Sequence, residues 1–140
     1  MAPANARSYE LASFSGSESA GIVLLLMDLD QPDKKVINAI EGAVKWFENH
    51  AIKGLKVERG LNSSGKRDTY TVTESNAPKI WARFYDLDTN KPYFCDRDGI
   101  KKNTLAEIGD ERRNGYSWYS SAPQVVLDRY PVWKKASGLL

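Results

Sequence analysis

The spacing of apolar residues changes abruptly at Gly54, and this change most constrains the fold. Between residues 33 and 53, apolar side chains recur at steps of three and four, the period of an amphipathic helix. Directly after Gly54, residues 55–58 alternate apolar and polar, as a half-buried strand does. The chain therefore combines at least one amphipathic helix with strands.

Similar patterns predict the remaining elements. Residues 17–27 predict a helix that is apolar on all sides and is therefore expected to be buried. The other predicted elements are a hairpin at 55–73, aromatic strands at 80–85 and 93–95, a long loop at 99–121, and a helix at 123–136 broken at Pro131. Residues 1–16 are expected to form an irregular arm. The predicted fold class is mainly α with a small antiparallel β portion.

Composition limits the classes of function. With 140 residues the chain is about one domain long. Its net charge of +2 makes no general case for binding nucleic acid or a membrane surface. The apolar run at 22–27 is far shorter than the roughly 20 residues that a membrane span needs. The first eight residues lack the apolar segment of a signal peptide.

Metal and thiol chemistry are equally restricted. The single cysteine, Cys95, excludes an internal disulfide and every zinc site that needs two thiolates. Residues 86–90 begin like a calcium-binding loop, but Lys91 and Arg97 stand where an EF-hand requires Gly and Glu. Residues 86–97 are therefore not an EF-hand.

A mixture of cationic and aromatic side chains occupies residues 81–119. Guanidinium groups pair carboxylates or phosphates, and aromatic faces stack on sugars or bases. The mixture suits an anionic sugar polymer or a nucleic acid, although the low net charge argues against the nucleic acid. The alternative is a set of aromatic core residues with arginines at the rim. The residues are Arg83, Arg97, Lys101, Lys102, Arg112 and Arg113, with Trp81, Tyr85, Tyr93, Tyr116, Trp118 and Tyr119.

The same region carries a family resemblance. The segments WARFY (81–85), CDRDG (95–99) and ERRNGYSWY (111–119) resemble the carboxyl-terminal half of pectate lyases of polysaccharide lyase family 10. ARSYE (6–10), SGSES (15–19) and EGAVKWFE (41–48) resemble the same family, in the same order along the chain.

This resemblance implies a fold and a reaction. The family has an (α/α) toroid and cleaves polygalacturonate, or pectate, by calcium-dependent β-elimination. Calcium and cationic groups on the uronate carboxylate acidify the proton on C5 and stabilise the developing charge. An arginine serves as the base, and Arg7 in ARSYE matches it. The implied substrate-binding residues are Arg83, Arg97, Arg112, Arg113, Tyr116 and Trp118.

The resemblance also implies that residues 1–140 are a partial domain. The family's catalytic module is about twice as long as this chain, and its calcium ligands lie upstream, in helices that the chain lacks. We therefore expect a fragment that is inactive alone, that leaves an apolar patch on helix 17–27 exposed, and whose partner is the missing amino-terminal half. The alternative is a non-catalytic remnant that binds acidic polysaccharide. An extracellular or periplasmic location is implied by the family.

Overall fold

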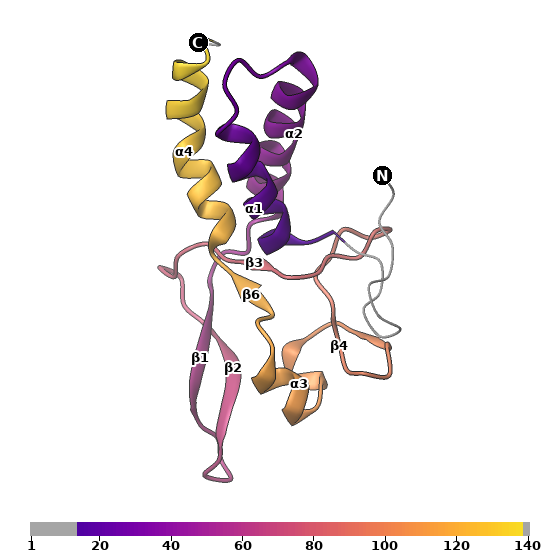
Figure 1. The fold of residues 1–140 in the computed structure, drawn as a ribbon. Coiled ribbons are helices and arrows are strands. Elements are labelled where there is room, and N and C mark those ends of the chain that lie inside the picture. The colour runs from indigo at the N-terminus through magenta and orange to yellow at the C-terminus, as the bar shows by residue number, and fades with distance from the viewer. Residues whose placement is uncertain (1–13, 139–140) are drawn as a thin grey trace.

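The structure is a computed structural model, and it describes residues 14–138. The helices are α1 (Gly16–Met27), α2 (Lys34–His50), α3 (Asp110–Gly115) and α4 (Ala122–Ala136), with a short 3₁₀ turn, η1, at Leu105–Glu107. The strands are β1 (Leu55–Leu61), β2 (Arg67–Thr73), β3 (Trp81–Ala82), β4 (Phe94–Cys95), β5 (Lys101–Lys102) and β6 (Tyr119–Ser120). Figure 1 shows a bundle of α1, α2 and α4 at one end and an extended region of hairpin, short strands and α3 at the other.

The helical end is built from capped helices around one core. The Asp33 carboxylate accepts a hydrogen bond from the Val36 backbone N–H at 3.0 Å, which satisfies a free donor in the first turn of α2. Apolar residues of all three long helices then meet a tryptophan from β3, whose indole N–H donates to the Phe47 carbonyl. The core comprises Ala20, Val23, Met27, Ile40, Val44, Phe47, Trp81, Val126 and Trp133.

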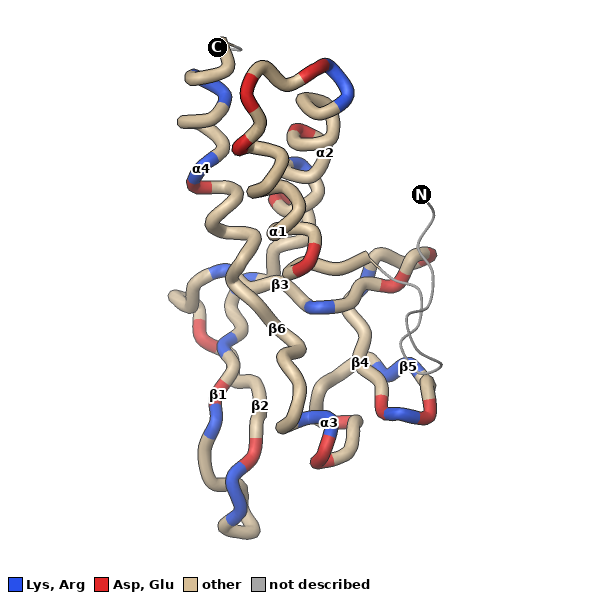
Figure 2. The backbone as a smooth tube through the Cα atoms, viewed as in Figure 1, with Lys and Arg blue, Asp and Glu red and all other residues tan. Residues whose placement is uncertain are grey.

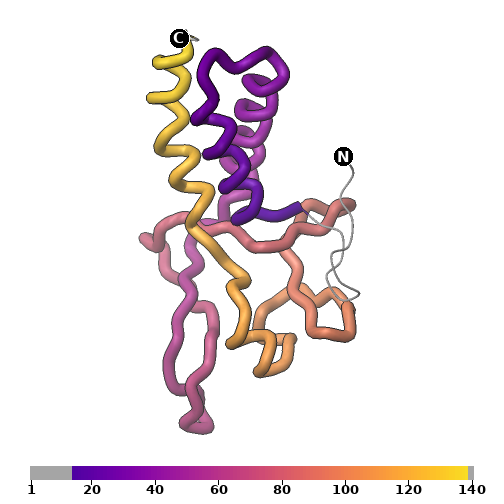
Figure 3. Tube along the Cα trace, viewed as in Figure 1, coloured from indigo at the N-terminus to yellow at the C-terminus, as the bar shows by residue number. Residues whose placement is uncertain are grey.

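The extended end has a second, smaller core. Strands β1 and β2 form the antiparallel hairpin predicted at 55–73, with Val57 opposite Thr71. Strand β4 pairs with β5, and β3 pairs with β6, which leads directly into α4 (Figure 3). Tyr93, Phe94, Cys95, Leu105, Ile108 and Trp118 pack together beneath these strands. The β3–β6 pair therefore joins the two ends of the molecule.

The structure corrects the predicted fold class. The described residues are 42% helix and 22% strand, so the chain is a mixture of helix and short antiparallel sheets and not mainly α. Its three long helices form one bundle and not an (α/α) toroid, because most of the chain between α2 and α4 is extended. No helix within residues 14–138 combines the length and apolar character of a membrane span.

Three local predictions are also wrong. Helix α1 is buried on one face only, because Ile22 and Leu25 are 60% and 67% exposed. Helix α4 continues through Pro131 without a break. Residues 99–121 contain β5, η1, α3 and β6, because contacts with distant parts of the chain order a segment whose own sequence favours loops.

Candidate functional site

The ring of Tyr116 is the centre of a cationic and aromatic cluster. The guanidinium carbons of Arg83 and Arg112 lie 4.3 and 4.5 Å from the ring centroid, within cation–π range. The ring of Phe84 stacks on the same tyrosine, with centroids 6.1 Å apart. The fold thus gathers two arginines that are 29 positions apart around one aromatic side chain.

Arg83 is the more accessible of these two arginines. It follows β3, and its side chain is 27% exposed. One terminal nitrogen donates to the Glu18 carboxylate of α1 at 3.0 Å. Its Nε is buried and has no hydrogen-bond partner among residues 14–138. A guanidinium has five N–H donors, so a further carboxylate can bind only through those on the exposed part of the side chain.

Arg112 and Trp118 support this cluster from below. Arg112 is only 8% exposed, and its guanidinium also lies 5.4 Å from the ring of Trp118. The Trp118 indole N–H donates to the Arg112 carbonyl at 2.9 Å, and its side chain is 3% exposed. Burial places Trp118 in the core beneath the cluster and not on a surface that a ligand can reach.

Arg97 and Arg113 point to other partners. Arg97 is 65% exposed, and its Nε donates to the Glu111 carboxylate at 2.7 Å. Arg113 makes a two-pronged ion pair with Asp68 at 2.8 and 2.9 Å and also donates to the Ile108 carbonyl. Arg113 therefore ties α3 to β2.

The Asp68 carboxylate is the acidic partner of Arg113 in this ion pair. Hydrogen bonds from Arg113 and Asn114 hold its pKa well below its usual range. The sequence does not predict a role for Asp68, because its partner lies 45 positions further along the chain and no pattern in the neighbouring residues indicates the pairing.

The predicted base, Arg7, lies outside the described residues. Within residues 14–138 no group of three or more His, Cys, Asp and Glu side chains is placed to hold a metal ion. Asp86, in the loop that begins like a calcium site, binds Lys101 at 2.6 Å and the backbone N–H groups of Asp88 and Thr89. These bonds lower the pKa of Asp86 to about 2.

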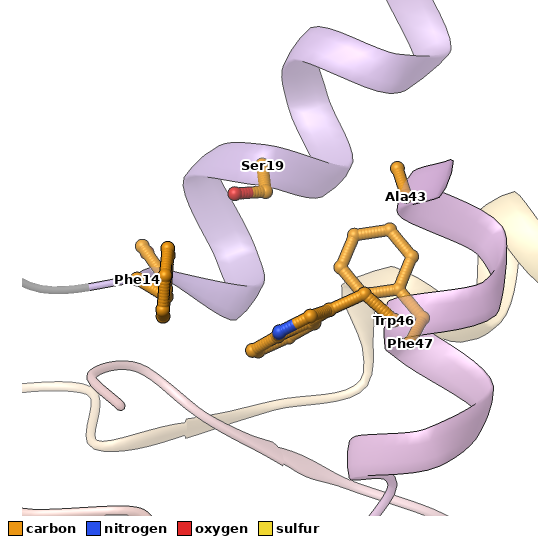
Figure 4. Close-up of a pocket in the computed structure, with 6 residues that line it drawn as sticks. Phe14, Ser19, Ala43, Trp46 and Phe47 are labelled. Atoms are coloured by element: carbon orange, nitrogen blue, oxygen red, sulfur yellow. The ribbon is translucent and has the colours of Figure 1, made fainter. Parts of the chain in front are cut away.

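An apolar hollow lies between the start of α1 and the middle of α2. Its volume is about 150 Å³, and the rings of Phe14, Trp46 and Phe47 line it (Figure 4). Ser15 lines the hollow, and its hydroxyl contacts the Glu18 carboxylate. An aromatic wall next to an ion pair suits the apolar face of a charged sugar ring.

Other hollows lie along the hairpin, including one of about 270 Å³ that is lined by residues of β2 and η1 and by Arg113. One of about 190 Å³ is lined by Arg59, Gly60, Arg67, Asp68, Thr69 and Asn114. A smaller one of about 80 Å³ is lined by Val57, Arg59, Thr69, Leu105, Tyr116, Ser117, Trp118 and Tyr119. Figure 2 shows basic positions on both strands of this hairpin, each beside an acidic position, Glu58 on β1 and Asp68 on β2. Sequence reasoning did not single out the hairpin arginines.

Comparison with known proteins gives one family and one kind of enzyme. The family model for pectic acid lyase matches residues 1–127. A family 10 polysaccharide lyase from Cellvibrio cellulosa is 33% identical, with a TM-score of 0.76 over 99% of this chain and 41% of that one.

A mutant of such a Cellvibrio cellulosa lyase, solved in complex with trigalacturonic acid, is 34% identical, with a TM-score of 0.76. The similarity covers 98% of this chain and 40% of the mutant's chain, so this chain spans less than half the length of that enzyme. No curated protein matches the sequence.

Proposed function

Because this chain belongs to the pectic acid lyase family, we propose that it is the substrate-carboxylate-binding part of a pectate lyase. The complete enzyme would cleave polygalacturonate by β-elimination. The family match confirms the resemblance predicted from the sequence. The trigalacturonic acid in the complex with the Cellvibrio cellulosa mutant supports an oligogalacturonate as the ligand.

The cluster around Tyr116 is the observation that carries this proposal. Polygalacturonate presents a carboxylate on every ring, and a guanidinium recognises a carboxylate through paired hydrogen bonds. Arg83 already binds one carboxylate, that of Glu18, and its side chain is 27% exposed, so a second carboxylate can approach it. The stacked rings of Tyr116 and Phe84 place apolar surface beside this charge.

The chemistry of elimination explains why such a group is needed. Removing the proton on C5 places negative charge next to the uronate carboxylate, and a fixed cation on that carboxylate stabilises it. We place Arg83 in this role, with Arg112 adding positive charge from beneath and Arg113 supporting the position of α3. The Arg97 side chain is 65% exposed, and we propose that it binds the carboxylate of a neighbouring sugar ring.

The base and the calcium site complete the proposal. Arg7 remains the proposed base, acting on the C5 proton. Calcium, when bound, would polarise the substrate carboxylate. The described residues do not fit a calcium site, since they contain no suitable group of ligands, and we therefore propose that the calcium ligands lie outside residues 14–138.

We further propose that the 140-residue chain binds substrate but does not cleave it. Support comes from its span, 40% of the mutant lyase's chain, and from the lack of a described calcium site. Turnover is measured from the absorbance of the unsaturated product with calcium added, and binding from calorimetric titration with trigalacturonate. We expect no turnover and measurable binding.

Arg83→Ala tests the binding role. A lost charge-assisted hydrogen bond of about 1.5–3 kcal/mol should weaken trigalacturonate binding roughly tenfold to a hundredfold. Lys35→Ala, which removes an exposed charge on α2, is the matched control and should bind normally. Equal affinity in wild type and Arg83→Ala would contradict the assignment.

The second function to consider is that of a non-catalytic acidic-polysaccharide-binding protein. The same cluster, without a described metal site, favours it. Adding the amino-terminal half of a family 10 lyase in trans distinguishes the two functions. Calcium-dependent turnover by the mixture supports the enzyme portion, whereas binding without any turnover supports the binding protein.

A further inference from the structure

We propose that the β1–β2 hairpin carries a second carboxylate-binding subsite, formed by Arg59 and Arg67. It would hold a uronate ring of a longer oligogalacturonate, away from the ring bound at Tyr116. This inference rests on the proposed function and extends it to the length of substrate that the chain recognises.

Strand register places both arginines on one face of the hairpin. Arg59 stands opposite Thr69, and Arg67 stands opposite Leu61, so the two arginines are diagonal neighbours. Diagonal neighbours on an antiparallel pair have side chains about 7–8 Å apart, within reach of one ligand. Thr69, 6% exposed, marks this face as the one turned toward the rest of the protein. The 190 Å³ hollow therefore has two guanidinium groups in its wall.

These two positive charges have no acidic partner in the described part of the chain. Neither Arg59 nor Arg67 forms an ion pair with any residue in the range 14–138. The one carboxylate in the wall, Asp68, is already engaged by Arg113 and Asn114. The hollow thus presents unpaired cations to an anion, and a carboxylate matches the guanidinium geometry.

The hairpin hollow is connected to the cluster around Tyr116. Arg59 and Thr69 line both the 190 Å³ hollow and the 80 Å³ hollow, and Tyr116 lines the smaller one. A continuous surface therefore runs from Arg67 through Arg59 to Tyr116. A polymer with a carboxylate on each ring can occupy both ends, whereas a short oligomer can occupy only one.

The test compares two substrate lengths. Trigalacturonate and hexagalacturonate are titrated into the 140-residue chain and into Arg59→Gln and Arg67→Gln, which keep side-chain polarity but lose the charge. We expect wild type to bind hexagalacturonate more tightly than trigalacturonate. Each variant should lose about three- to tenfold affinity for the hexamer, a range that allows for solvent exposure, and keep its affinity for the trimer.

Lys66→Gln is the matched control. It removes one exposed charge at the tip of the same hairpin, outside the hollows, and should preserve the advantage of the hexamer. The midpoint of thermal unfolding checks each variant. If Arg59→Gln lowers this midpoint, the subsite is judged from the hexagalacturonate affinity of Arg67→Gln alone.

The outcomes separate two failures. Wild type that binds neither oligomer overturns the proposed function itself. Wild type that binds both, with an advantage for the hexamer that persists in both arginine variants, overturns only the hairpin subsite. An equal loss in Lys66→Gln would also overturn it, because the effect would then be one of net charge.

Discussion

At the scale of single residues, Tyr116 organises the site. Its ring lies within 4.5 Å of the guanidinium carbons of Arg83 and Arg112, and it also contacts Phe84 and Trp118. The negative face of the ring offsets part of the repulsion between the two cations. The aromatic ring therefore helps two arginines to share this place.

Replacing this ring tests its role. Tyr116→Leu keeps an apolar side chain but removes the cation–π contacts, each of which contributes about 0.5–2 kcal/mol. We expect the free energy of unfolding, measured by urea titration, to fall by about 1–3 kcal/mol, and trigalacturonate affinity to fall as well. Tyr116→Phe, which keeps the ring, is the control. A full loss in Tyr116→Phe would show that the hydroxyl, and not the ring, matters.

Tyr119 makes the protein sensitive to alkali. Burial, with a smaller contribution from Tyr85, raises the pKa of Tyr119 to about 12, from an ordinary value near 10. The folded state therefore holds this proton more tightly than the unfolded state does. Its contribution to stability is complete below pH 10 and is lost between about pH 10 and 12.

Tyr119→Phe should flatten this part of the stability profile. We expect its free energy of unfolding to decline less between pH 10 and 12 than that of wild type, by about 1–2 kcal/mol. Urea unfolding at a series of pH values measures the difference. Tyr70→Phe, at an exposed tyrosine of β2, should retain the decline of wild type. Identical profiles for Tyr119→Phe and wild type would contradict the assignment.

At the scale of elements, α4 contains an unusual residue. Pro131 lies in its interior, where proline lacks the N–H that would bond the carbonyl four residues earlier and its ring crowds that carbonyl. The helix nevertheless continues, because Val126 and Trp133 on either side of the proline are buried in the helical core. Tertiary packing therefore offsets a local cost.

Pro131→Ala should remove this cost. Pro131 is exposed, so alanine leaves no cavity, and we expect the free energy of unfolding to rise by about 1–3 kcal/mol. Val132→Ala, at a neighbouring position that is 69% exposed, is the control and should change stability by less than about 1 kcal/mol. Urea titration of both variants measures the effect. A loss of stability in Pro131→Ala would show that the proline ring itself makes favourable contacts.

At the scale of the whole molecule, the exposed face of α1 stands out. Ile22 and Leu25 are 60% and 67% exposed and lie three positions apart on one face of the helix, and Leu29, just beyond its end, is 48% exposed. The exposed apolar patch predicted from the sequence is thus confirmed for this helix. Such a face is typical of an interaction surface, and the proposed amino-terminal half is the partner that we expect to cover it.

This face predicts self-association of the isolated chain. Sedimentation should show the average mass rising with protein concentration, because burying these side chains between copies removes apolar area from water. Leu25→Gln should reduce the association while leaving thermal stability nearly unchanged. Val23→Gln, at a position 4% exposed in the core, should instead unfold the chain at a lower temperature. Monomeric wild type at all concentrations would contradict the prediction.

The sequence by itself determined helix α2, the β1–β2 hairpin and the family. Helix α2 and the hairpin follow from the periods of three to four and of two, which depend only on near neighbours in the chain. Helix α2 ends at His50, three residues before the predicted end, because the backbone at Ala51 is already extended. Membership of the lyase family was also predicted correctly, since its motifs are local strings of residues.

Only the tertiary structure decided which distant residues meet. Strand β3 pairs with β6, Arg83 binds Glu18 across 65 positions, and Arg113 binds Asp68 across 45 positions. It also decided that the long helices form a bundle and that Trp118 is buried while Arg83 remains accessible. No local pattern encodes such pairings, because they depend on how separate elements share two cores, and the candidate site is made of these pairings.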